Sequence, residues 1–89
     1  MKAVITVIGK DKVGIIADVS GQCAKFGANI IDITQSVMRE YFAMVMLVDI
    51  DRRNVSFSDF QQKLNEVAVK KGLEIHVMHE DIFNSMHRI

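Results

Sequence analysis

The stretch that decides the fold is AVITVIGKDKVGII, residues 3–16, in which an apolar run meets a short polar loop and then a second apolar run. β-Branched residues dominate positions 3–8, which predicts a strand that is apolar on both faces except at Thr6. Beyond the loop, apolar residues begin to recur at helical spacing. We therefore expect a strand, a tight loop and a helix that begins at the loop, with Asp11 as its N-cap.

The helix predicted after this loop buries one stripe. Ile16, Val19, Cys23 and Phe26 recur at steps of three and four residues, which places them on one helical face. Gly27 follows the last of them and suits the C-terminal end of the helix.

The rest of the chain continues the alternation of strands and helices. Residues 29–38 alternate as a half-buried strand, and residues 41–50 form its partner. A second helix is expected between an N-cap at Ser56 and a terminating Gly72, followed by a strand that begins near Leu73. The order strand, helix, strand, strand, helix, strand predicts an α+β, ferredoxin-like βαββαβ fold, with a four-stranded antiparallel sheet and both helices on one face.

A short C-terminal tail completes the predicted architecture. We expect one domain over residues 1–89, with its core in residues 3–78 and a tail in residues 79–89. The tail suits a short turn of helix, which is too short to be stable alone and must dock on this chain or on a neighbour. The first and third strands are apolar on both faces, so a partner sheet or the tail should cover the face that the helices leave open.

Composition narrows the possible functions. Eleven basic and eleven acidic residues balance, so nothing favours nucleic acid as a partner, and no apolar run is long enough to span a membrane. Cys23 is the only cysteine, which excludes an intrachain disulfide and fits a cytoplasmic protein without a signal peptide. A chain of 89 residues buries a modest core, and assembly into a homodimer or higher oligomer is a common remedy.

The sequence gives little support for a metal site, a cofactor site or a catalytic site. His76 and His79 are three residues apart, so on one strand they point to opposite faces and do not share an ion. Cys23 lies on the predicted core stripe, where a thiol behaves as a small apolar group. No nucleophile stands beside a base, so we expect no catalytic residues, no metal, no cofactor and no enzyme activity.

The loop itself suggests a site for a small carboxylate. The start of a helix presents free N–H groups and a dipole that favour an anion, and Gly14, without a Cβ, lets a ligand approach the backbone. Asn29 opens the next strand and can offer an amide. A purely structural interpretation stays open, in which Asp11 and Gly14 form a cap and a tight turn and Asn29 is a turn residue.

Two segments carry a resemblance to a known family. GKDKVGIIA, residues 9–17, and FGANIIDI, residues 26–33, resemble the signature of the ACT domain over roughly residues 3–78. The ending IFNSMHRI, residues 82–89, is similar to that of stand-alone single-ACT-domain proteins of bacteria and archaea, a UPF-type family of uncharacterised proteins. The paired ACT modules of glycine-cleavage repressors resemble the chain more distantly.

The resemblance implies a regulatory module that senses a small molecule, usually an amino acid, at a homodimer interface. Carried over to this chain, the ligand site consists of Asp11, the backbone at Val13 and Gly14, and Asn29 from the second subunit. Asp11 then takes the ligand's ammonium group, and the N–H groups at Val13 and Gly14 take its carboxylate. The alternative is a dimerisation scaffold without a ligand, which docks on a larger protein through residues 80–89.

Overall fold

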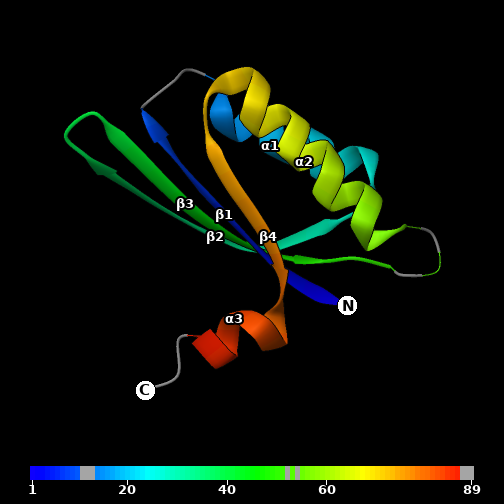
Figure 1. Cartoon of the computed structure of the whole chain (residues 1–89). Coiled ribbons are helices and arrows are strands. Elements are labelled where there is room, and N and C mark those ends of the chain that lie inside the picture. The colour runs from blue at the N-terminus through cyan, green and yellow to red at the C-terminus, as the bar shows by residue number, and fades with distance from the viewer. Residues whose placement is uncertain (11–13, 52, 54, 87–89) are drawn as a thin grey trace.

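The computed structural model describes residues 1–10, 14–51, 53 and 55–86. Figure 1 shows a sheet with two helices on one face and a short third helix on the other. In chain order the elements are β1 (Lys2–Lys10), α1 (Ile15–Lys25), β2 (Asn29–Met38), β3 (Tyr41–Asp49), α2 (Phe57–Lys71), β4 (Glu74–His79) and α3 (Glu80–Met86).

The sheet has four strands in the order β2-β3-β1-β4, and all three neighbouring pairs are antiparallel. β1 is therefore central, as its apolar composition predicts, and β2 is an edge strand. The ferredoxin-like βαββαβ architecture expected from the sequence is confirmed, with a short C-terminal helix added to it.

The core lies between the sheet and the pair α1 and α2. From the sheet, Ile5, Val7, Met44 and Met46 point into it and are fully buried. Burying such side chains stabilises the fold by about 1.5–3 kcal/mol each. The ring of Phe26 also meets that of Phe60 edge to face, with 5.4 Å between the centroids.

The start of α1 differs from the expectation. The helix begins at Ile15 and its N-cap is Gly14, so the prediction that Asp11 is the cap is wrong; Asp11 itself lies outside the described residues. The stripe that α1 buries consists of Ile15, Val19 and Cys23. Ile16 remains 38% exposed, so its assignment to the core was also wrong. Ile15 and Ile16 precede Val19 by four and three residues, and Ile15 takes the buried position, at 3% exposed.

α2 follows its sequence signals. The Ser56 hydroxyl accepts a hydrogen bond of 3.3 Å from the Asp59 N–H, which confirms the predicted cap. Phe60 and Leu64 are fully buried, and Gly72 ends the helix in the left-handed conformation with φ 69°.

β2 departs most from the prediction. Each of its ten residues is exposed, so the expected half-buried strand is wrong for a single copy of the chain. A bulge between Ile30 and Asp32 adds a residue to the strand. Beyond the bulge, Gln35 and Val37 pair with Met44 and Phe42 and share their side of the sheet. Among the described residues α1 contacts β2, but α2 does not reach it.

The tail folds as α3, which lies on the sheet face opposite α1 and α2 and packs on β1 and β4 (Figure 1). It therefore docks on its own chain, one of the two outcomes that its length allowed. No helix among the described residues is long and apolar enough to cross a membrane.

Candidate ligand-binding groove

A groove opens where α1 begins beside the edge of the sheet. It has a volume of about 580 Å³ and is lined by the first turn of α1 and by side chains from the far end of the β2–β3 hairpin. The lining residues are Gly14, Ile15, Ile16, Ala17, Gln35, Val37 and Phe42. It thus combines the start of a helix, one side-chain amide and an apolar wall.

The backbone of the groove is set by Gly14. Its φ of 89° and ψ of 2° lie in the left-handed region, which glycine adopts without the strain that a side chain brings. Among the described residues no side chain caps the helix. The Asp18 N–H donates to the Gly14 carbonyl over 2.9 Å. The N–H groups that precede Asp18 at the start of the helix have no helical carbonyl to bond to. Such a helix start favours an anion.

The space beside Gly14 is open. A Cβ built on it meets no atom within 4 Å, so close packing against this chain does not explain the missing side chain. The left-handed backbone conformation is therefore what favours glycine at position 14. The missing side chain also leaves room for a ligand beside the backbone.

Gln35 is the polar side chain that the sequence analysis did not select for the site. It lies on the same side of β2 as Val37, next to the start of α1. The sequence held one signal for Gln35, because it is the polar residue in the otherwise apolar row of alternate residues from 31 to 37. An amide there can both donate and accept hydrogen bonds, which suits a carboxylate or an ammonium group.

Asn29, the other described residue of the predicted site, lies elsewhere in the same copy. It lines a second hollow of about 530 Å³ with Met1, Gly27, Asp49, Ile50 and Asp51. α1, eleven residues long, separates Gly27 from Gly14, a span of roughly 16 Å. Within one copy, therefore, Gly14 and Asn29 are not brought together. Asp11 and Val13, the remaining predicted site residues, lie outside the described residues.

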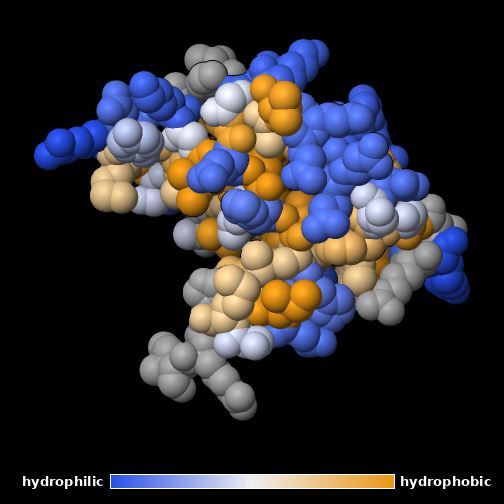
Figure 2. Space-filling view, in the orientation of Figure 1, coloured by the Kyte–Doolittle hydropathy of each residue, from blue (hydrophilic) through white to orange (hydrophobic). Residues whose placement is uncertain are grey.

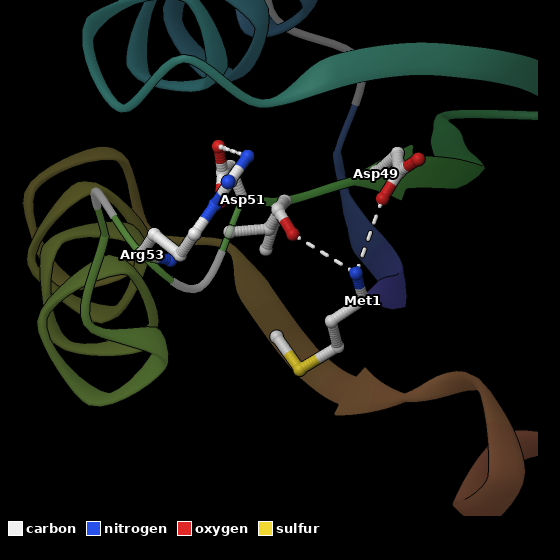
Figure 3. Close-up of polar contacts among 5 residues, drawn as sticks. Met1, Asp49, Asp51 and Arg53 are labelled. Atoms are coloured by element: carbon white, nitrogen blue, oxygen red, sulfur yellow. Dashed lines mark hydrogen bonds and ion pairs between the residues drawn. The ribbon is translucent and has the colours of Figure 1, made fainter.

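The hollow at Asn29 is acidic and already holds a cation from its own chain. The Met1 ammonium donates to Asp49 Oδ1 over 3.2 Å and to the Ile50 carbonyl over 3.0 Å (Figure 3). Arg53 donates side-chain and backbone hydrogen bonds to the Asp51 carboxylate, and these lower the pKa of Asp51. The carboxylates at this end suit a positive partner, which makes it a poor place for a ligand carboxylate.

The remaining reactive side chains form no site in the described part of the chain. Cys23 is buried, and burial raises the pKa of its thiol to about 11, which keeps it protonated and unreactive at neutral pH. His79 Nδ1 accepts the Asp81 N–H over 3.1 Å at the start of α3. The described residues hold no group of three that could bind a metal ion.

The family of the chain follows from comparison with known proteins. The ACT domain family model matches residues 2–78. A UPF0237 protein of Clostridium acetobutylicum is 53% identical over 89 residues, which are the whole of both chains. A solved ACT domain protein from Streptococcus pneumoniae is 41% identical, covers 93% of each chain and superposes with a TM-score of 0.81.

The chain therefore belongs to the ACT-domain family, whose members commonly bind amino acids as regulatory modules. The resemblance noted in the sequence, including the UPF-type relatives, is confirmed. A further structural relative is the regulatory subunit of aspartate kinase from Thermus thermophilus, at 26% identity and a TM-score of 0.68, over 89% of this chain and 51% of that one.

Proposed function

We propose that this protein is a regulatory module that binds an amino acid or a similar small carboxylate between two copies of the chain. The groove at Gly14 carries the proposal. It offers helix backbone, the Gln35 amide and an apolar wall, but one side of it is the unpaired edge of the sheet. A site built in this way is completed by whatever pairs with that edge.

The edge strand β2 favours a second copy as the completing partner. All ten of its residues are exposed, with Asp32 as its only charged side chain, and an edge that lacks protecting charges is a template for strand pairing. Two such strands that pair antiparallel along their length place the start of one beside the end of the other. Asn29 of the second copy then lies near Val37, at the groove that Gly14 opens in the first.

The chemistry of the groove matches the two charged groups of an amino acid. We place the carboxylate on the N–H groups at Val13 and Gly14 and the ammonium on Asp11, while Asn29 of the second copy hydrogen-bonds the ligand. Gln35 adds a second amide from the copy that supplies Gly14. Ile16 and Val37 give the ligand's side chain an apolar wall, which favours an apolar or mixed side chain over a charged one.

The regulatory mechanism is linkage. A ligand that touches both copies stabilises the paired arrangement, and at a concentration of 100 times its Kd it adds about 2.7 kcal/mol to folded-state stability. The dimer that results presents a different surface to a downstream protein. We place this module in the cytoplasm and assign it no catalytic step.

A thermal-shift screen with each of the twenty amino acids tests the proposal. We expect one or two of them to raise the Tm by a few degrees, and the Gln35→Ala variant to lose most of that increase. Gln62→Ala, a change of the same size on the exposed side of α2, is the matched control and should keep the response. A response that survives Gln35→Ala unchanged places the site elsewhere.

A second candidate function is a dimerisation scaffold that binds no small molecule. The observation in its favour is α3, on which Ile82 and Met86 remain exposed and could contact a larger protein through residues 80–89. Removing residues 80–89 separates the two candidates. A sensor keeps its ligand response without them, whereas a scaffold shows no ligand response at all and loses its protein partner.

A further inference from the structure

The sheet has a second face, opposite α1 and α2, which we call the open face. On β1 it is formed by Val4, Thr6 and Ile8, which pair across the strands with Leu47, Val45 and Ala43 of β3. On β4 it continues through His76 and Met78. Most of these side chains are apolar, although no second layer formed by the described residues covers the whole face.

α3 covers only one part of the open face. It packs on β1 and β4, where Val4 is 4% exposed, but β3 lies beyond its reach. Ile8 and Val45 therefore stay 47% and 40% exposed. Between α3 and these residues lies a cleft of about 580 Å³, walled by Phe83 and Met86 on the helix side. Figure 2 shows the surface hollowed between the body of the molecule and α3.

α3 also presents an apolar ridge away from its own sheet. Ile82 and Met86 are one helical turn apart, so they lie on the same side of the helix, and they are 55% and 65% exposed. A helix of seven residues is not stable on its own, so it depends on burial of its apolar side chains. Ile82 and Met86 contribute little to that burial while they stay exposed.

Cleft and ridge together make one large apolar patch. Ile8, Val45, Ile82 and Met86, with the partly covered Met78 and Phe83, expose on the order of 500 Å² of apolar surface, at the upper end of what one patch on a monomer shows. A stable interface buries about 800 Å² per partner, so this patch can supply the apolar centre of one.

We propose that the open face is an interface between two copies of this chain, in which the Ile82–Met86 ridge of each copy fills the cleft of the other. Ridge and cleft lie side by side on the same surface, which is the condition for a self-complementary, two-fold contact. This interface is separate from the β2 edge and does not depend on a ligand.

Charge supports the same arrangement. α3 carries Glu80 and Asp81 in its first turn. Lys10 extends the row of Thr6 and Ile8 on the open face, at the end of β1 away from the start of α3. Two antiparallel α3 helices bring the acidic turn of one copy toward Lys10 of the other, so the rim is complementary where the centre is apolar.

Sedimentation equilibrium of the full chain, over roughly 1–100 μM, tests the proposal. We expect Val45→Lys in the cleft and Met86→Lys on the ridge each to halve the mass of the wild-type assembly, because each buries a charge in the apolar centre. Val69→Lys, on a valine that is 86% exposed on α2, introduces the same charge away from the patch and should leave the mass unchanged.

The halving separates this interface from the one at β2. With both interfaces present the mass falls from four copies to two, and with the open face alone it falls from two to one. If the wild-type chain is a monomer throughout, or if both variants keep its mass, another occupant fills the cleft and the proposal is wrong. Should Val45→Lys fail to fold by circular dichroism, the exposed Met86→Lys decides alone.

Discussion

Gly14 and Gly21 lie in or next to the same helix, and adding one methyl group to each should change stability in opposite directions. In Gly14→Ala the added Cβ meets no atom within 4 Å, so its effect comes from the backbone alone. A left-handed conformation costs an alanine about 1–2 kcal/mol, and the loss of freedom in the unfolded chain returns about 0.4–1 kcal/mol. We expect a net loss of roughly 1 kcal/mol.

Gly21→Ala is the matched control within α1. The added Cβ again meets nothing within 4 Å, and the residue is helical without a positive φ. Alanine is better than glycine in a helix interior by about 0.5–1 kcal/mol, so this variant gains stability. Since 1 kcal/mol moves the Tm of a small domain by about 4–8 °C, the two variants should melt roughly 10 °C apart.

Thermal unfolding followed by far-UV circular dichroism, with urea unfolding as a second measure, gives both differences. The comparison tests the geometry on which the ligand groove depends, because a left-handed Gly14 is what aims the start of α1 at the groove. If Gly14→Ala is as stable as Gly21→Ala, the helix does not begin at a left-handed Gly14, and the anion site described here loses its basis.

Two further predictions concern α2 and the core. Ser56→Ala should cost about 1 kcal/mol in urea unfolding, because it removes the acceptor for the Asp59 N–H, whereas Ser58→Ala in the first turn should be nearly neutral; equal effects would contradict the cap. Burial raises the pKa of the Cys23 thiol from 9.0 to about 11, so the folded protein should react slowly with a thiol reagent at pH 8 and rapidly once unfolded in guanidinium. Because the folded-state pKa is the higher one, stability should fall from pH 9 towards pH 11 in the wild type and less steeply in Cys23→Ala.

The sequence was sufficient for the order and type of the main elements because most of them carry local signals. α2 has a serine cap, three buried residues at steps of four positions and a glycine at its end, and each of these signals is local in the sequence. The sequence predicted that the tail docks, but not on which surface. Its place on β1 and β4 depends on contacts between distant segments, which no local pattern records.

The burial of β2 could not be predicted from its local sequence pattern. Its alternation was interpreted as half burial, but burial depends on the strand order, and the order places β2 at the edge. The bulge at Ile31 also shifts the row that faces the helices, so Ile33, Gln35 and Val37 share a side that Ile31 was expected to join. Pairing with a second copy would cover this strand and restore the burial that its apolar residues suggest.

The predicted site and the groove share Gly14, but most of the residues that line the groove were not selected from the sequence. Gly14 was selected because a helix start without a side chain can hold an anion, and the groove lies there. Gln35 was not selected because it lies on the face of the strand that was expected to be buried, away from any ligand. Ile16 was assigned to the core because it lies three residues before Val19, but Ile15, four residues before Val19, takes the buried position.

The most direct test of the central proposal is isothermal titration calorimetry of the full chain with the amino acids that raise its Tm. We expect saturable binding, with one ligand per groove, that weakens at least tenfold in Gln35→Ala and is unchanged in Gln62→Ala. An absence of binding heat for all twenty amino acids at millimolar concentration would contradict the proposed sensor function and favour the scaffold.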